Sequence, residues 1–323
     1  MRAVVTGAAG FIGSHLCEHL MSCGDEVVGI DAMTDFYEPW RKRQNLGRLL
    51  DRDGFTFRQG DLLDLRLEPL FADADAVYHL AGQPGVRGSW GAEFTVYLER
   101  NVLVTQRVLE VARDTGLHRL VFASSSSVYG DAEAYPTPEA VCPRPVSPYG
   151  VTKLAAEQLC ETYRTAFGVP AASLRLFSVY GPRQRPDMAF SRLVAAACTQ
   201  RPFPLYGDGG QSRDFTYVGD VVTAMREAAL SSWNGVANLG GGSEVTMNQA
   251  IALLGQLAAP VNVVRGPARP GDARRTSADI TVARDAFGFR PVTDIRTGLA
   301  AMVRAERASR PTRPEGHSVA GRR

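Results

Sequence analysis

Tyr149 and Lys153 are the two residues whose types and spacing best suit proton transfer. They form a Y-x-x-x-K pair, and a spacing of four residues places both side chains on one face of a helix. A tyrosine ordinarily loses its proton at about pH 10, but a neighbouring ammonium favours the phenolate. Tyr149 is therefore a candidate general base near neutral pH. The pair alone does not settle this role, because the same spacing occurs on many solvated helix faces.

A run of hydroxyl side chains, Ser124 to Ser127, lies upstream of this pair. It follows the apolar segment from Leu120 to Ala123, which we interpret as a buried strand. In a doubly wound sheet the carboxyl ends of the strands line the ligand crevice. Ser125 and Ser126 are therefore expected to hydrogen-bond a substrate oxygen and to share its proton with Tyr149. For Ser124 we expect an ordinary polar loop position.

Three glycines near the N-terminus, Gly7, Gly10 and Gly13, form a G-x-x-G-x-x-G run. The run lies between a predicted strand, Ala3 to Thr6, and a predicted helix, Phe11 to Cys23. In this context the glycines allow a tight turn, a close approach of the backbone to a pyrophosphate, and close packing of helix on strand. The helix N-terminus offers free N–H groups to the phosphates. We interpret the segment as a dinucleotide site.

Asp31 ends the second predicted strand, Val27 to Ile30, 18 residues after Gly13. A carboxylate there accepts hydrogen bonds from a ribose and repels a 2′-phosphate, which favours NAD over NADP. The other predicted cofactor residues are Phe11 and Ile12 at the helix start, Asp61 and Leu62 after the third strand, and Leu80, Ala81 and Gly82 after the fourth. His79 is expected to be a packed histidine at a strand end rather than a catalytic group.

Alternation of short apolar runs with longer helical patterns organises these residues. It predicts an α/β fold, with a Rossmann-like doubly wound parallel sheet covered by helices on both faces. Further strands are predicted at Ala76 to Leu80 and Ala171 to Phe177, and further helices at Glu99 to Asp114 and Tyr149 to Phe167.

The pattern changes after about residue 178, where prolines and a glycine cluster break it into shorter elements. We predict an NAD-binding domain over residues 1–178, with a later return of the chain at about 214–240. Residues 179–305 are predicted to form mainly a smaller C-terminal α/β substrate domain. The polar segment 306–323 is predicted to be a disordered tail, and we assign it no role.

Composition limits the classes of partner. The 323 residues carry a formal net charge of +2, which gives no case for nucleic-acid or membrane binding. No apolar stretch reaches the length of a membrane span, and none at the N-terminus resembles a signal peptide. The five cysteines show no metal-site spacing, so we expect no metal and free thiols in a reducing compartment. These features predict a cytoplasmic protein.

With these motifs in place, the chain resembles the extended short-chain dehydrogenase/reductase family, in its sugar-nucleotide epimerase and dehydratase branch. The resemblance covers roughly residues 1 to 300. It implies that Tyr149 and Lys153 are the catalytic pair and that Ser125 is the catalytic serine or threonine. It also implies a structural or cofactor-side role for Asn101. The family's first step takes a proton from the sugar 4-hydroxyl while hydride moves from C4 to NAD.

Relatives that dehydrate carry Asp-Glu where this chain has Ser126-Ser127, and glucuronate decarboxylases carry an acidic residue there. Removing water across C5 and C6 needs an acid and a base, which two serines supply poorly. This departure argues against a dehydratase and, more weakly, against a decarboxylase. The remaining expectation is a 4-epimerase in which the 4-keto sugar turns over and takes the hydride back on its other face.

The segment from Tyr180 to Ala189 resembles the Y-G-P-x-x-R-P-D-M-A segment of UDP-glucuronate 4-epimerases. Arg185 is expected to pair with the sugar carboxylate, and Ser178 to hydrogen-bond it, since a guanidinium fork fits a carboxylate. A 4-keto glucuronate loses carbon dioxide when its carboxylate bond aligns with the carbonyl π system. We therefore expect these two residues to hold the carboxylate out of that alignment.

Resemblance also predicts the residues around the nucleotide. Those expected to contact the diphosphate, ribose or base are Tyr206, Gln211, Arg213, Arg269 and Asp272, and Arg87 is expected near the sugar or phosphate. The expected function is NAD-dependent 4-epimerisation of UDP-glucuronic acid to UDP-galacturonic acid. The alternatives are another UDP-hexose 4-epimerase, a UDP-glucuronate decarboxylase, or a non-catalytic NAD-binding regulator. Relatives often dimerise through two helices from each subunit, so a homodimer is expected through Glu99 to Asp114 and Tyr149 to Phe167.

Overall fold

The computed structural model describes residues 1–267 and 273–309. Within them, seven parallel strands form the main sheet in the order β10-β6-β5-β4-β1-β2-β3. The strands are β1 (Arg2–Thr6), β2 (Glu26–Asp31), β3 (Phe55–Gln59), β4 (Ala76–His79), β5 (Leu120–Ser125), β6 (Ala171–Leu176) and β10 (Gly235–Leu239). The predicted doubly wound α/β sheet is confirmed, and the predicted strands agree with these bounds to within one or two residues at each end.

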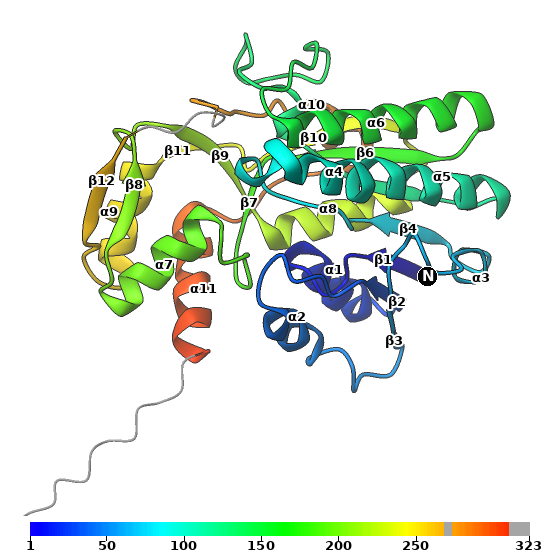
Figure 1. Cartoon of the computed structure of the whole chain (residues 1–323), viewed down its shortest axis with the longest axis horizontal. Coiled ribbons are helices and arrows are strands. Elements are labelled where there is room, and N and C mark those ends of the chain that lie inside the picture. The colour runs from blue at the N-terminus through cyan, green and yellow to red at the C-terminus, as the bar shows by residue number, and fades with distance from the viewer. Residues whose placement is uncertain (268–272, 310–323) are drawn as a thin grey trace, which may run out of the picture.

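Helices cover both faces of this sheet (Figure 1). On one face, α1 (Phe11–Ser22), α8 (Val218–Leu230) and α10 (Thr281–Phe287) share an apolar core with β1 and β10. On the other face, α3 (Glu68–Phe71), α5 (Val104–Asp114) and α6 (Pro148–Phe167) share a second core with β4 and β5. The short helix α2 (Pro39–Leu46) follows β2 and packs beside α1.

A smaller unit stands at one end of the main sheet (Figure 1). Its core joins aromatic and aliphatic residues such as Tyr180, Phe190 and Leu299. Among the described residues its strands are β7 (Ser178–Tyr180), β9 (Ser212–Tyr217) and β11 (Glu244–Thr246) in one sheet, and β8 (Phe203–Tyr206) and β12 (Val263–Gly266) in another. Its helices are α7 (Ala189–Thr199), α9 (Met247–Leu257) and α11 (Ile295–Ala308).

The chain crosses between the two units more than once. Of the predicted return at about 214–240, α8 and β10 pack with the main sheet, where β10 pairs in parallel with β6, while residues 214–217 belong to β9 of the smaller unit. A second return, α10, packs on α8 and β10, although the sequence analysis placed it in the smaller domain. Ala283 and Phe287 bury their side chains in the main core. Seven residues are too few to show this attachment by periodicity alone.

The segment between β4 and α5 is built from short helical turns. They are η1 (Arg87–Ser89), η2 (Gly91–Glu93), α4 (Phe94–Tyr97) and the π-helix η3 (Leu98–Leu103). The predicted helix Glu99 to Asp114 therefore begins as π-helix and becomes α-helical at Val104. Among the described residues, no helix combines the length and apolar character needed to cross a bilayer.

Local sequence explains where α6 begins and ends. Ser147 caps the helix by accepting a hydrogen bond from the Gly150 N–H at 3.1 Å, and Pro148 occupies the first turn, where its missing N–H costs nothing. Gly168 ends the helix in the left-handed conformation. Because the start is fixed at Ser147, Tyr149 lies in the first turn of α6, beside the carboxyl end of β5.

A buried ion pair fixes α6 to β6. Arg175 donates to Glu157 through Nε and Nη2, with a shortest distance of 2.6 Å, and the side chains are only 4% and 0% exposed. Ser124 donates to the same carboxylate at 2.6 Å, and Arg175 donates to the Tyr129 hydroxyl at 2.7 Å. The expectation of an ordinary polar loop position for Ser124 was therefore wrong, because Ser124 is buried within β5 and its hydroxyl is held by Glu157.

We predict that Glu157→Ala lowers the free energy of unfolding by about 3–5 kcal/mol, because it leaves the Arg175 guanidinium buried without its partner. Chemical denaturation measures this. The matched control is Glu161→Ala on the same helix, which removes a half-exposed pair with Arg164 and should cost less than about 1 kcal/mol. Equal losses in the two variants would contradict the prediction.

Candidate active site

The carboxyl ends of β1, β2, β4 and β5 meet along one edge of the sheet. These strands end at Thr6, Asp31, His79 and Ser125. Their parallel register brings the glycine run, the acidic residue, the small-residue turn and the serine run into one row. The structure therefore assembles at one edge residues that are up to about 120 positions apart in the chain.

The glycine run forms a cradle in which backbone lies against backbone. A Cβ on Gly13 would lie 2.1 Å from the Gly7 carbonyl oxygen, and one on Gly7, where φ is +71°, would lie 2.9 Å from the Ala81 nitrogen. A Cβ on Gly82 would lie 2.7 Å from Oδ1 of Asn101. The first-turn N–H groups of Phe11 and Ile12 have no acceptor one turn earlier in the helix, so they remain available to a pyrophosphate. The cradle fits a dinucleotide.

Asp31 is buried at the end of β2. Its carboxylate accepts the Ala9 N–H at 3.1 Å and the Met33 N–H at 2.7 Å. The ammonium of Lys42, from α2, lies 3.4 Å away and also donates to Thr34. Sequence reasoning missed Lys42, because a lone lysine in a polar helix carries no pattern that points back to Asp31.

The next two strands end in backbone that is held by side chains. The amides of Leu80 and Ala81 both donate to the Thr6 hydroxyl at 3.1 Å, which fixes the turn after β4 against the end of β1. Asp61, expected to reach the adenine, accepts from the Leu63 N–H at 3.0 Å and pairs with the Arg100 guanidinium. Leu62 beside it is buried. Asp61 therefore lies at the predicted edge, with an arginine partner that the sequence did not reveal.

Asn101 ties the turn after β4 to the catalytic helix. Its Oδ1 accepts the Gln83 N–H at 2.7 Å, and its Nδ2 donates to Thr152 of α6 at 3.0 Å. His79 is fully buried and hydrogen-bonds Thr6 and Thr105 at 2.9 and 3.1 Å. Burial lowers the pKa of His79 to about 3, so the ring is neutral. His79 is a packed histidine, as expected.

Tyr149 and Ser125 face each other at the end of β5. The pKa of the Tyr149 phenol is raised above its ordinary value, because desolvation outweighs the hydrogen bond from Ser125 and the positive charge of Arg185, which both lower it. The ring of Tyr97 lies edge-on to that of Tyr149, with centroids 6.3 Å apart. The Tyr97 hydroxyl donates to the Gly85 carbonyl at 2.8 Å and holds the β4–η1 loop beside the phenol. Sequence reasoning missed Tyr97, since an aromatic residue in a short helix reads as core.

Lys153 lies one turn after Tyr149 on α6 and is buried. Its ammonium lies over the Phe122 ring, 4.3 Å from the centroid, and within the described residues it has no hydrogen-bonding partner. Desolvation lowers the pKa of Lys153 to about 8. An ammonium on a buried residue, with no acceptor among the described residues, fits a hydroxyl ligand such as a ribose, which is a second observation in favour of the dinucleotide.

Arg185 belongs to the segment between β7 and α7. Its Nε and Nη2 donate to the two carboxylate oxygens of Asp187, each at 3.0 Å, and its guanidinium lies 5.8 Å from the Phe36 ring centroid. Its charge reaches both Tyr149 and Tyr97. Ser178 opens β7, where it pairs with Phe215 of β9. The charge of Arg185 thus acts on the phenol, while its predicted pairing with a sugar carboxylate stays a prediction.

Most of the described residues that are predicted to contact the nucleotide lie in the smaller unit. Arg87 stacks on the Tyr206 ring at 5.4 Å, although the two residues come from different units. Gln211 donates to the Tyr206 carbonyl at 3.3 Å, and Arg213 donates to the Ser212 carbonyl at 2.9 Å. The structure therefore brings Arg87, Tyr206 and Gln211 together. The predicted residues Arg269 and Asp272, and most of the predicted tail, lie outside the described residues.

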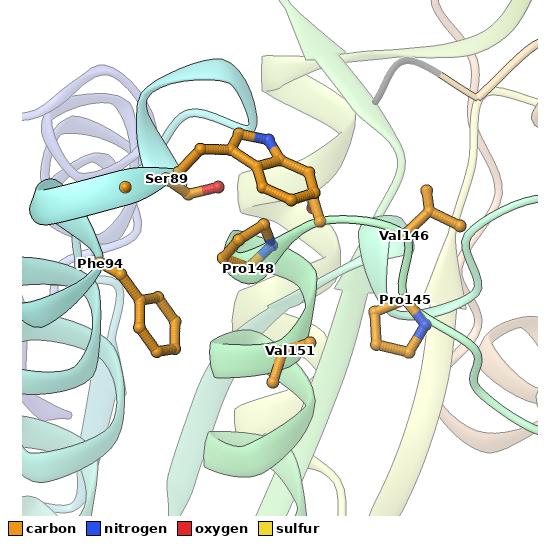
Figure 2. Close-up of a pocket in the computed structure, with 9 residues that line it drawn as sticks. Ser89, Phe94, Pro145, Val146, Pro148 and Val151 are labelled. Carbon is orange, nitrogen blue, oxygen red and sulfur yellow. The ribbon is translucent and has the colours of Figure 1, made fainter. Parts of the chain in front are cut away.

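A separate cavity of about 570 Å³ opens beside the start of α6 (Figure 2). Its lining comes from the η1–η2–α4 segment and from α6 with the residues before it: Ser89, Trp90, Gly91, Phe94, Pro145, Val146, Ser147, Pro148 and Val151. Val151 projects roughly opposite to Tyr149, because two helical residues differ by about 200°. The cavity therefore lies on the outer face of α6. Within the described residues, no cluster of histidine, cysteine or acidic residues suits a metal.

We predict that Asp31→Asn weakens NAD binding about tenfold or more, because hydrogen bonds to a charged acceptor are lost. NADP should lose less, since the repulsive carboxylate is gone while Lys42 remains. Dissociation constants for both nucleotides measure this. Asp35→Asn, in the exposed part of the same loop, is the control and should leave both unchanged. An unaltered preference for NAD in the Asp31 variant would contradict the prediction.

Comparison with known proteins agrees with this geometry. Residues 3–240 match the NAD dependent epimerase/dehydratase family. An uncharacterized UDP-glucose epimerase of Bacillus subtilis (strain 168), YtcB, is 41% identical over 93% of this chain and 96% of its own. The solved UDP-glucuronic acid 4-epimerase of Bacillus cereus, in complex with UDP-glucuronic acid and NAD, is 39% identical and covers 95% of this chain and 99% of its own, with a TM-score of 0.91.

MoeE5, solved in complexes with UDP-glucuronic acid and NAD and with UDP-glucose and NAD, is 42% identical. It covers 96% of this chain and at least 99% of its own, with a TM-score of 0.86. The expected fold class and the expected NAD dependence are confirmed. The cradle at Gly7 to Gly13, the buried carboxylate at the end of β2 and the match over the sheet lead to one conclusion: the chain belongs to the NAD-dependent epimerase/dehydratase family.

Proposed function

We propose that this protein, an NAD-dependent UDP-sugar 4-epimerase, converts UDP-glucuronic acid to UDP-galacturonic acid. The observation that carries the choice of sugar is the position of Arg185, whose positive charge acts on the Tyr149 phenol. A sugar whose 4-hydroxyl meets Tyr149 has its C5 substituent one carbon further along the ring. A guanidinium in that neighbourhood favours a carboxylate over a hydroxymethyl group at C5.

The chain's own groups supply the proton chemistry. We propose that Tyr149 takes the proton of the 4-hydroxyl and that Ser125 hydrogen-bonds the same oxygen while the proton moves. The Lys153 ammonium, one turn along α6, favours the phenolate. When bound, NAD accepts the hydride from C4 and later returns it. Because the cofactor is regenerated in each cycle, Gly7 to Gly13, Asp31 and Lys42 must hold it through many turnovers.

The 4-keto sugar must rotate without losing its carboxylate. We propose that Arg185 and Ser178 hold that group through charge-assisted and neutral hydrogen bonds, out of alignment with the carbonyl. The serines at 126 and 127 offer hydrogen bonds to the sugar but no acid that would eliminate water. Arg87, Tyr206, Gln211 and Arg213 are proposed to bind the UDP part, with Arg269 and Asp272 completing that site.

Two specific observations favour a second candidate, a UDP-glucose 4-epimerase. YtcB is named for UDP-glucose, and MoeE5 was solved with UDP-glucose as well as with UDP-glucuronic acid. Arg185 distinguishes the candidates, because a neutral hydroxymethyl group gains little from a guanidinium. A decarboxylase would need an acidic group at position 126 or 127. A non-catalytic regulator would have no need for Ser125, Tyr149 and Lys153 in this arrangement.

Incubation of the purified protein with UDP-glucuronic acid, without added NAD, tests the proposal. Separation of the nucleotide sugars should show UDP-galacturonic acid as the main product. UDP-xylose or a 4-keto pentose as the main product would overturn it in favour of decarboxylation. Turnover of UDP-glucose but not of UDP-glucuronic acid would favour the second candidate. Loss of every activity in Tyr149→Phe separates an enzyme from a regulator.

We predict that Arg185→Leu raises the KM for UDP-glucuronic acid by roughly tenfold to a hundredfold, the range expected when a charged hydrogen bond is lost. A pentose product should appear, because the carboxylate is free to align with the C4 carbonyl. Nucleotide-sugar chromatography measures both effects. Arg192→Leu on α7 is the control for the loss of one positive charge. Unchanged KM and no pentose would contradict the role of Arg185.

A second prediction concerns pH. The pKa of Lys153 is lowered to about 8, so the ammonium is fully present below that pH and is lost as pH rises through it. Its loss withdraws stabilisation from the Tyr149 phenolate, and kcat/KM should fall above about pH 8. In Lys153→Arg the guanidinium stays protonated, so any remaining activity should fall only at higher pH. The same alkaline limit in both proteins would refute this explanation.

We also propose a homodimer formed by α5 and α6. The two helices pack side by side, and Gln106 of α5 donates to Tyr163 of α6 at 3.2 Å. Their outer surface, with η3, exposes large apolar side chains: Leu98, Leu103, Val151 and Phe167. The apolar cavity of Figure 2 lies beside Val151, at the N-terminal end of α6. Large exposed apolar side chains on two neighbouring helices are consistent with a protein interface.

We predict that Leu103→Asp combined with Val151→Asp converts the dimer to a monomer, since each charge would be buried without a partner. Analytical ultracentrifugation gives the mass. Val292→Asp, which changes an exposed valine distant from these helices, should leave the dimer intact. A wild-type protein that sediments as a monomer would exclude the proposal. No disulfide links any of the five cysteines, all of which lie within the described residues, and this supports the further proposal that the enzyme works in the cytoplasm.

A further inference from the structure

Residues 181–188, here called the carboxylate loop, connect β7 to α7 and carry Arg185. Hydrogen bonds within the loop and to its flanks make it a stiff unit. The Gln184 side chain, which is buried, donates to the Val179 carbonyl at 2.9 Å and accepts the Ser191 N–H at 2.8 Å. The Met188 N–H donates to the Arg185 carbonyl at 3.1 Å. A displacement of one part of the loop therefore moves Arg185 as well.

A two-pronged ion pair fastens this loop to the cofactor helix. Arg183 donates through Nη1 and Nη2 to the two carboxylate oxygens of Glu18 on α1, at 2.8 and 2.6 Å. The loop runs beside α1 in Figure 1, and the paired residues are 165 positions apart in the chain. The side chains are only 15% and 27% exposed, so water screens the pair less than it screens a surface bridge.

Two further observations show that the contact is built into the fold. Arg183 has a φ of +64°, a left-handed conformation that a residue with a Cβ adopts at an energetic cost. One turn before Glu18, His15 is half-buried, and desolvation together with the Arg183 charge lowers the pKa of His15 to about 3. A neutral ring and an acidic side chain thus face the guanidinium on one side of α1.

We propose that Glu18 and Arg183 are positioning residues that fix the carboxylate loop, and with it Arg185, relative to the cofactor helix. This inference rests on the proposed function. The first turn of α1 fixes the position of the dinucleotide at the edge of the sheet, and α6 fixes the position of Tyr149. The Glu18–Arg183 pair adds a third fixed contact. It places the guanidinium of Arg185 against the C5 carboxylate of the sugar while C4 of the sugar faces the cofactor. Apart from this pair, the loop makes a weaker contact with the main unit, in which the Arg185 guanidinium lies 5.8 Å from the Phe36 ring centroid.

The pair is tested by binding and product analysis on the NAD-loaded protein. Glu18→Gln and Arg183→Asn each remove it, and asparagine tolerates the left-handed backbone. Each variant should raise the Kd for UDP-glucuronic acid roughly tenfold and release some pentose product, because a small displacement of a holding group is costly. The Kd for UDP, which has no sugar carboxylate, should change less than about twofold.

The double substitution Glu18→Arg with Arg183→Glu restores the pair in reverse and should recover much of the affinity for UDP-glucuronic acid. Glu161→Gln is the matched control, because it disrupts a two-pronged pair with Arg164 that lies within one helix. It should change neither Kd. Unchanged Kd values in the single variants, equal losses for UDP and UDP-glucuronic acid, or no recovery in the reversed pair would each overturn the positioning role. A wild-type protein that binds UDP-glucuronic acid no better than UDP would instead refute the proposed function, and the inference with it.

Discussion

The whole site depends on one close contact, in which the backbone of Gly13 lies against the carbonyl of Gly7. A methyl group at residue 13 would lie 2.1 Å from that oxygen, so the contact exists only without side chains. It brings the first turn of α1 to the end of β1 and directs its N–H groups toward the crevice. The neighbouring strands, in parallel register, then bring Asp31, the turn at Leu80 and Ser125 to the same level. Catalytic chemistry at this edge is a consequence of how tightly the first helix approaches the sheet.

Buried charged groups differ between the structural core and the candidate active site. In the structural core, buried titratable side chains form ion pairs or are uncharged. Glu157 pairs with Arg175, and the His79 ring is neutral. In the site, Lys153 is a buried residue whose ammonium lies over the Phe122 ring, with no hydrogen-bonding partner among the described residues. A group left in that state stabilises little in the folded protein and much in a complex that supplies an acceptor. The paired groups of the core therefore stabilise the fold, whereas the Lys153 ammonium gains its interaction energy when a ligand binds.

Sequence reasoning placed the strand ends, the glycine cradle and the Tyr149–Lys153 pair because each rests on local spacing. Through resemblance it also predicted Arg185 as a partner of the sugar carboxylate, and this stays a prediction. It did not find Lys42 beside Asp31, Arg100 beside Asp61, or Tyr97 against Tyr149, since these contacts join separate elements and follow no period. The Glu18–Arg183 pair is of the same kind, because nothing near residue 18 indicates a partner 165 residues later. The return of α10 to the main core was missed for the further reason that so short a helix has almost no signature.

The interleaved path of the chain has a consequence for engineering by recombination. β10 covers the edge of β6, yet it is encoded after most of the loop, helix and strands that face the substrate. A fragment that stopped near residue 178 would leave the backbone of β6 open to pairing with other chains. A chimera meant to exchange sugar specificity must therefore graft at least two separate segments between fixed points at α8–β10 and at α10. Relatives of this fold would then be expected to diverge in sugar preference through changes within those segments, since a single crossover separates strands that belong together.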